Sequence, residues 1–250
     1  DPLLHGSRLP IPFRPPALYP FRLMSSIESV IAGIPEADDI DISDKKLGDA
    51  DVQRIAKAME QGITATGLHF GGNQITDAGM AALAQAMAKN MSVTQMSLKR
   101  NQISDKGAIR LARALARDAC LVELDLRDNQ ISDEGAKALA KALETNGTLQ
   151  KLHLEDNCIG DDGAKAFAQA ARRNSELRQL DLALNCIGRP GITALLDAAA
   201  AMDKEISCGY QETGFRATGH RMEGAAREAV KFACFGMVSK ALSTSMFRAM

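Results

Sequence analysis

Apolar and polar positions recur along the chain with a period of 28 residues. Between residues 37 and 204 the sequence divides into six consecutive lines of this length without a gap. The lines start at Ala37, Ala65, Val93, Leu121, Leu149 and Leu177. We number the positions of each line from 1 to 28. A regular period of this size is typical of repeat proteins, in which each unit packs on its neighbours.

Positions 4 and 6 are apolar in every line, whereas position 5 between them is polar. In the fourth line Leu124 and Leu126 flank Asp125. Alternation with a period of two predicts a short strand that buries one face. Six such strands, one from each line, are expected to stack as a parallel sheet.

Position 9 carries asparagine in every line after the first. The residues are Asn73, Asn101, Asn129, Asn157 and Asn185. An asparagine inside a turn has a donor and an acceptor for the free backbone groups of its own coil and of the next one. We therefore expect the five asparagines to form a structural ladder along the stack.

The second half of each line has the pattern of a helix. In the fourth line Ala136, Leu139, Ala140 and Leu143 form one apolar stripe. We interpret Asp133 as the N-terminal cap of this helix. Position 26, which is Gly, Asn or Asp, is interpreted as the left-handed residue that ends the helix.

The repeated pattern LxxLxLxxNxIxDxGAxxLAxAL resembles the ribonuclease-inhibitor-like subclass of leucine-rich repeats. The resemblance covers residues 37–204 and implies an α/β fold. That fold is a right-handed βα solenoid, a horseshoe arc of six 28-residue repeats with a parallel concave sheet and convex helices. The first and last lines depart from the pattern, with Lys45 in place of the asparagine and Arg189 in place of the aspartate. Terminal repeats differ because one side lacks a neighbouring repeat.

The stack is expected to curve, because adjacent strands lie about 4.8 Å apart while packed helices need about 8–10 Å. Solenoids commonly bind their partners on the concave side. Positions 3, 5, 7 and 8 are predicted to face this side. The predicted partner-binding residues there are Asp39, Asp41, Asp44, His69, Gln95, Lys99, Arg100, Glu123, Asp125, Arg127, Asp128, Lys151, His153, Glu155, Asp156 and Asp181. This set has no Tyr or Trp, residues that anchor many tight interfaces, so we expect modest affinity from polar contacts.

The resemblance implies a non-enzymatic scaffold that binds a protein partner, and we expect a cytoplasmic monomer. The alternative is a GTPase-activating protein for a small GTPase, because the Ran GTPase activators share this repeat class. A catalytic pair of His153 and Cys158 is not expected, because positions 5 and 10 should face different directions.

Composition excludes several other functions. The net charge is −1 and no long block of one sign occurs, which argues against a nucleic-acid partner. No apolar run reaches the roughly 18 residues of a transmembrane helix. The five cysteines lack CxxC spacing and the four histidines are scattered, so we expect reduced thiols, no metal site and no cofactor. Cys158 and Cys186 share position 10; a disulfide between them is the alternative to the two free thiols that we favour.

The two ends of the chain lie outside the repeat. Residues 1–23 hold six of the eight prolines and three arginines and are expected to be a disordered leader, with an organelle transit peptide as the alternative. Residues 24–36 are predicted to form an N-terminal capping helix. Residues 205–222 are interpreted as a Gly-rich loop. Residues 223–250 have a helical pattern, for either a C-terminal cap or a helix that binds a partner or a membrane surface.

Overall fold

The computed structural model describes residues 38–62, 64–201, 205–208 and 216–217. The predicted leader, the capping helix over 24–36 and the C-terminal helix over 223–250 lie outside these residues. The described part alternates short strands with helices up to residues 205–207, and a further strand follows at residues 216–217.

The strands form one sheet in chain order. They are β1 (Asp39–Asp41), β2 (Gly67–His69), β3 (Gln95–Ser97), β4 (Glu123–Asp125), β5 (Lys151–His153), β6 (Gln179–Asp181), β7 (Glu205–Ser207) and β8 (Arg216–Ala217). Strands β1 to β7 are parallel, and only β8 pairs in the antiparallel sense. From β1 to β6 each residue pairs with the one 28 positions later, so the register follows the sequence period.

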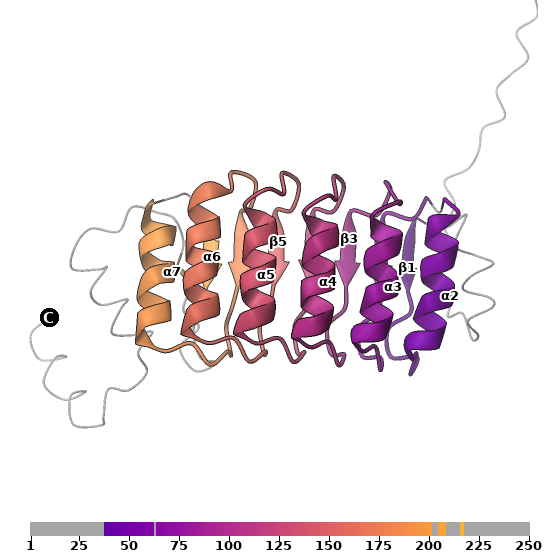
Figure 1. The fold of residues 1–250 in the computed structure, drawn as a ribbon, viewed down its shortest axis with the longest axis horizontal. Helices are drawn as coiled ribbons and strands as arrows, with labels where there is room; N and C mark the ends of the chain where they lie inside the picture. Colours follow the sequence, from indigo (N-terminus) through magenta and orange to yellow (C-terminus); the bar gives the residue numbers. More distant parts are fainter. Residues whose placement is uncertain (1–37, 63, 202–204, 209–215, 218–250) are drawn as a thin grey trace, which may run out of the picture.

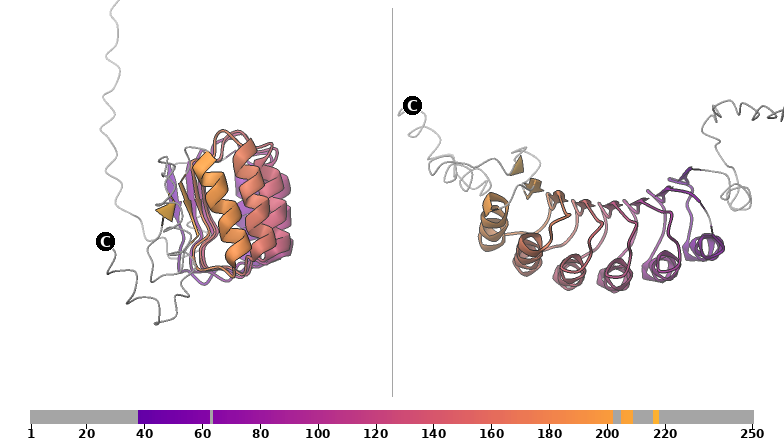
Figure 2. Two further views of the ribbon diagram at one scale, coloured as in Figure 1. Left: turned by 90° about the vertical axis from the view of Figure 1, so that its left-hand side faces the viewer. Right: turned by 90° about the horizontal axis from the view of Figure 1, so that it is seen from above.

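The helices pack side by side on one face of this sheet (Figure 1). They are α2 (Asp49–Glu60), α3 (Asp77–Met87), α4 (Asp105–Leu115), α5 (Asp133–Leu143), α6 (Asp161–Arg173) and α7 (Arg189–Ala201). Seen along the strands, the molecule is an arc with the strands on the inner side and the helices on the outer side (Figure 2). The predicted βα solenoid, with a parallel concave sheet and convex helices, is confirmed.

The core is the continuous layer between sheet and helices. Leu124 and Leu126, at positions 4 and 6, are fully buried against Leu139 and Leu143 of the helical stripe. Positions 4 and 6 are also buried in each of the remaining five repeats. Each repeat adds one strand and one helix to this layer. The apolar face of a repeat is therefore covered only when a neighbouring repeat packs against it.

The loop predicted over residues 205–222 is wrong at its start, where β7 extends the parallel sheet. Ile206 pairs with Leu180, which is 206 − 180 = 26 residues earlier. The sixth repeat is therefore two residues shorter than the others, and a 28-residue line puts Cys208 where Ile206 belongs. Both side chains are buried, and Cys208 takes the place of a position 6 residue. β8 pairs with the outer edge of β7.

Candidate binding surface on the inner sheet

The buried asparagines at position 9 connect each coil to the previous one. The Asn101 amide donates to the carbonyls of Leu98 at 2.9 Å, Lys99 at 3.2 Å and, one coil back, Phe70 at 3.0 Å. Its Oδ1 accepts from the N–H of Ile75 at 3.1 Å. Equivalent bonds form at Asn73, Asn129, Asn157 and Asn185. Strands of three residues leave many loop backbone groups without ladder partners, and these amides pair them.

A second ladder consists of the aspartates at position 13. Asp105 Oδ1 accepts from the backbone N–H groups of Ser132 at 2.7 Å and Gly135 at 2.9 Å, and Oδ2 accepts from the Ser132 hydroxyl. Asp105 is the first residue of α4, yet it bonds the N-terminus of α5. Asp49, Asp77, Asp133 and Asp161 each do the same for the following helix.

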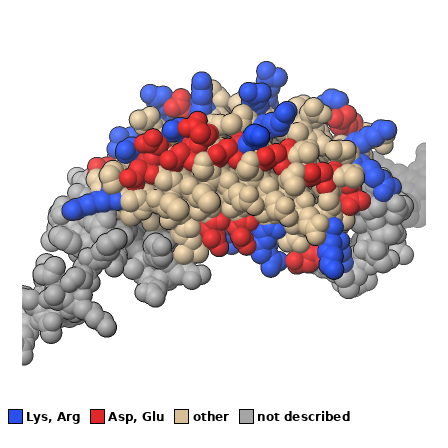
Figure 3. Space-filling view, turned by 60° about the horizontal axis from the view of Figure 1, so that its bottom comes forward, with Lys and Arg blue, Asp and Glu red and all other residues tan. Residues whose placement is uncertain are grey.

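The interpretation of Asp133 as the cap of its own helix is therefore wrong. Asp133 bonds the N–H groups of Gly160 and Gly163 at the start of α6, both at 2.8 Å. The N-cap residue of α5 is Ser132. Stacking brings the next helix start within reach of the carboxylate, and negative charge there also interacts favourably with the helix dipole. Acidic side chains run along this edge of the molecule (Figure 3).

Position 15 is glycine because the aspartate ladder leaves no room for a side chain. A Cβ on Gly135 would lie 2.7 Å from Asp105 Oδ1 and 2.9 Å from the Cβ of Ala108. Gly79, Gly107, Gly163 and Gly191 are equally crowded. The glycine of the repeat is thus a consequence of the bond between neighbouring coils.

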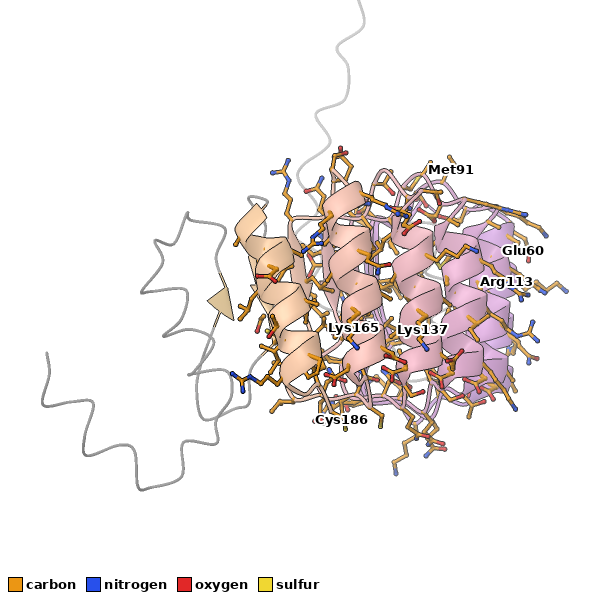
Figure 4. All side chains as sticks on the ribbon, turned by 60° about the vertical axis from the view of Figure 1, so that its left-hand side comes forward. Glu60, Met91, Arg113, Lys137, Lys165 and Cys186 are labelled. Carbon is orange, nitrogen blue, oxygen red and sulfur yellow. The ribbon has the colours of Figure 1, made fainter. Side chains whose placement is uncertain are left out.

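Position 26 forms a third ladder at the opposite edge, where Met91 lies, while Cys186 marks the aspartate edge (Figure 4). Asn146 Oδ1 accepts from the N–H groups of Thr148 at 3.1 Å and Leu149 at 2.8 Å, and its amide donates to the carbonyl of Leu115 in the preceding coil at 2.8 Å. The prediction of left-handed residues at position 26 is wrong for every residue except Gly62. Apart from Gly62 and from Lys46 at position 10, the left-handed residues of the described part lie at position 8: Asp44, Gly72, Arg100, Asp128, Asp156 and Leu184.

The inner face of the sheet has a different character, because its charged side chains bond one another at the surface. Two ion pairs near the surface span two repeats and one repeat, respectively: Arg100–Asp44 at 3.1 Å and Lys151–Glu123 at 3.1 Å. In addition, His69 Nε2 lies 2.9 Å from Asp39 Oδ1 in the preceding repeat. A Cβ on Gly72 would overlap the Asp44 carboxylate, so this glycine makes room for the pair that spans two repeats. Exposed pairs of this kind contribute about 0–1 kcal/mol each.

The middle of the inner face holds an ion pair whose carboxylate is buried and whose arginine is partly exposed. Arg127 donates from Nε and Nη2 to the two oxygens of Asp125 at 2.9 and 2.8 Å. Asp125 is only 7% exposed. Burial opposes ionisation of this carboxyl, but the hydrogen bonds and charge of Arg127 outweigh it and hold the pKa of Asp125 below its ordinary value.

Beside this pair lies a cluster of His153, Glu155 and Asp181. One nitrogen or oxygen of each lies within 4.8 Å of those of the others. The carboxylate of Glu155 raises the pKa of His153, whereas burial and the same carboxylate raise the pKa of Asp181. The repeat pattern predicts all three residues on the inner face, whereas the spacing of cysteines and histidines predicts no metal site. The pairing of β5 with β6 is what brings them together.

The remaining predicted residues are placed along the same face. Gln95, Asp128 and Asp156 are exposed, and Lys99 is half-buried. Asp41 is exposed and accepts from the N–H of Ser43 at 2.9 Å. Partial burial opposes its ionisation, but the hydrogen bonds from Ser43 lower the pKa of Asp41 overall.

Within the described residues, no helix combines the length and the apolar character needed to cross a bilayer. None of the four cysteines there forms a disulfide, and Cys158 and Cys186 are exposed.

Comparison with known proteins identifies the repeat. The family model described as "Leucine Rich repeat" matches residues 66–84, 89–112, 118–140, 145–168 and 173–196. No curated protein matches the chain.

Solved structures with a similar fold include the actin-binding site 2 of leiomodin-1. It is 19% identical with a TM-score of 0.45, over 69% of this chain and 86% of that one. An internalin from Listeria monocytogenes is 25% identical with a TM-score of 0.39, over 57% of this chain and 35% of that one. Pollen receptor kinase 3 is 16% identical with a TM-score of 0.41, over 75% of this chain and 76% of that one.

Proposed function

Because this chain belongs to the leucine-rich repeat proteins, we propose that it is a non-enzymatic scaffold whose concave sheet binds a protein partner. The observation that carries the proposal is the inner face itself. Seven parallel strands present polar side chains on a continuous surface that no described helix covers. Concave surfaces of this kind are the usual binding sites of solenoids.

Two properties of the surface support a binding role. The backbone beneath it is tied from coil to coil by the asparagine and aspartate ladders, so little conformational entropy is lost when a partner docks. The exposed ion pairs, such as Arg100–Asp44, are weak and can be exchanged for pairs with a partner. We expect a partner with charges of both signs, modest affinity, and an association rate that falls with salt.

We also assign the repeats to the ribonuclease-inhibitor-like subclass, on the basis of their 28-residue length and the helix in each repeat. The exposed free thiols of Cys158 and Cys186 support a reducing compartment such as the cytoplasm. A monomer remains our expectation. The GTPase-activator alternative receives no support from the family match or from the described residues.

Charge reversal on one face tests the proposal. In the inner-face variant Lys99, Arg100, Arg127 and Lys151 are changed to Glu. The matched outer-face variant changes Lys106, Arg110, Arg113 and Lys165 to Glu. All four residues are exposed on the helices, and Figure 4 labels Arg113 and Lys165. Affinity capture with quantitative mass spectrometry then compares the partners that each variant retains.

We expect at least a tenfold loss of captured partner for the inner-face variant and little loss for the outer-face variant. Because Arg127→Glu removes the partner of buried Asp125, a variant that keeps Arg127 separates lost binding from lost folding, with circular dichroism as the check. Equal partner recovery by folded inner-face and outer-face variants would show that the binding surface is wrong.

A further inference from the structure

Three potential ligands converge on the inner face from two strands. His153 and Asp181 are register partners on β5 and β6, and Glu155 lies two residues after His153. His153 Nδ1 is 3.8 Å from Glu155 Oε1. One ligand atom from each of the three side chains lies within 4.8 Å of the other two.

Two atoms of this cluster are buried without a hydrogen-bond partner, namely His153 Nδ1 and Glu155 Oε2. These side chains are only 14% and 17% exposed. About nine in ten buried polar atoms in proteins have a hydrogen-bond partner. Two buried atoms without one, on neighbouring side chains of the same cluster, therefore indicate a missing ligand. A cation would satisfy both atoms at once.

The negative charge of the two carboxylates in the cluster also favours a bound cation. Asp125 is neutralised by the bidentate bond from Arg127, so that arginine is already engaged. Glu155 and Asp181 remain as two partly buried carboxylates beside the imidazole of His153. Together they carry a charge of −2 when ionised, which a divalent ion would balance.

The imidazole is oriented for metal binding. His153 Nε2 faces Glu123 Oε1 at 3.8 Å, on the opposite side of the ring from Glu155. Glu123 is itself held by Lys151 at 3.1 Å. A carboxylate next to one ring nitrogen of a histidine favours the proton on that nitrogen and leaves the lone pair of the other nitrogen for a metal. Glu123 is placed to act in this way on Nε2, so that Nδ1, inside the cluster, can serve as the metal ligand.

We propose that His153, Glu155 and Asp181 bind a divalent first-row transition ion, best fitted by Zn²⁺. One nitrogen and two oxygens suit zinc, whereas Ca²⁺ and Mg²⁺ prefer ligand sets made of oxygen alone. Zinc–ligand distances of about 2.0–2.2 Å place ligand atoms at most about 4.4 Å apart, so the side chains move slightly inward on binding. The fourth coordination position opens toward the inner face. The inference does not depend on the proposed protein partner.

The chain contains its own control site. His69 occupies the same repeat position as His153 and also lies beside a carboxylate, Asp39, at 2.9 Å. The residues equivalent to Glu155 and Asp181 are there Gly71 and Ser97. His69 and Asp39 thus place a histidine and a carboxylate on the same sheet without counterparts of Glu155 and Asp181.

Zinc titration of the full chain against a chromophoric chelator, with elemental analysis after desalting, measures affinity and stoichiometry. The variants are His153→Gln, Glu155→Gln and Asp181→Asn, with His69→Gln as the matched control. A Cys158→Ser/Cys186→Ser background removes the two exposed thiols as competing ligands. Co²⁺ absorption spectra report nitrogen and oxygen coordination in the visible range without thiolate bands.

We expect each ligand variant to bind one equivalent of zinc fewer than the parent chain, and His69→Gln to bind as the parent does. Glu123→Gln should weaken zinc binding about tenfold, as changes behind a ligand generally do. Zinc should raise the Tm of the parent and leave that of His153→Gln unchanged, and circular dichroism in EDTA establishes that the variants are folded. Identical zinc stoichiometry and affinity in the parent and in folded His153→Gln would overturn the proposal.

Discussion

The inner face of the sheet and the loop edge where strands lead into helices use polar side chains in opposite ways. At the edge, Asn101 and Asp105 are bonded to backbone groups of neighbouring coils, and the same two residue types recur in repeat after repeat. On the inner face the residue changes from strand to strand, and exposed charges such as Lys151 and Glu123 bond one another. We infer that the edge maintains the fold while the sheet is free to carry recognition.

The physical basis of this division is the backbone. The seven parallel strands are only three residues long each, so the loops contain many N–H and C=O groups that no strand can pair. Leaving such a group buried and unpaired costs about 1–3 kcal/mol. When an exposed side chain of the inner face is lost, its partner is solvated by water, which replaces most of the bond.

The largest effect is expected at the asparagine ladder. Asn101→Ala leaves the carbonyls of Phe70 and Leu98 and the N–H of Ile75 without their partner. The free energy of unfolding should fall by about 3 kcal/mol, measured by urea denaturation. Gln102→Ala, one residue away and exposed, is the control and should change it by less than about 0.5 kcal/mol. A loss below about 1 kcal/mol for Asn101→Ala would show that the asparagine ladder does not stabilise the fold as proposed.

An intermediate effect is expected where a side chain is added beside the aspartate ladder. Gly135→Ala places a Cβ 2.7 Å from Asp105 Oδ1, which must move away from the N–H groups that it accepts from. We expect the free energy of unfolding to fall by about 2 kcal/mol. Gly147→Ala is the matched control, because nothing lies within 4 Å of a Cβ there. If both variants unfold at the same urea concentration, close packing does not explain the glycine.

A smaller effect is expected from the charge of the aspartate ladder. Asp105→Asn keeps the size of the side chain and one acceptor oxygen for Ser132 and Gly135, but removes the negative charge at the start of α5. The loss should be about 1 kcal/mol, and thermal unfolding at low and high salt measures how much of it is screened. Asp128→Asn, exposed on the inner face, is the comparison and should have little effect.

Much of the fold follows from residue patterns within one repeat, because burial of positions 4 and 6 and of the helical stripe is a local property of the chain. The errors arise where the partner is one coil away. Asp133 was assigned to its own helix because helix-capping rules consider residues near in sequence, whereas its partners Gly160 and Gly163 are 27 and 30 residues later. The strand at Ile206 was missed because the last repeat is shorter than the period.

The inner-face residues could be placed from the sequence, but their chemistry could not. His69 and His153 occupy the same repeat position and differ only in their neighbours on the adjoining strand and at position 7. Those neighbours lie two and 28 residues away, and the second is a contact between adjacent strands that spacing along the chain does not reveal. His153 Nδ1 is buried and has no hydrogen-bond partner. This state depends on packing across three strands, which the sequence alone does not specify.

The most direct test of this division of roles is the unfolding free energy of the triple variant Gln95→Ala/Lys99→Ala/Arg100→Ala, measured in urea beside Asn101→Ala. All four residues belong to one repeat, three of them on the inner face and one at the edge. The account predicts that the triple variant loses less than about 1 kcal/mol, whereas Asn101→Ala alone loses about 3 kcal/mol. A triple variant that is as unstable as Asn101→Ala would contradict it.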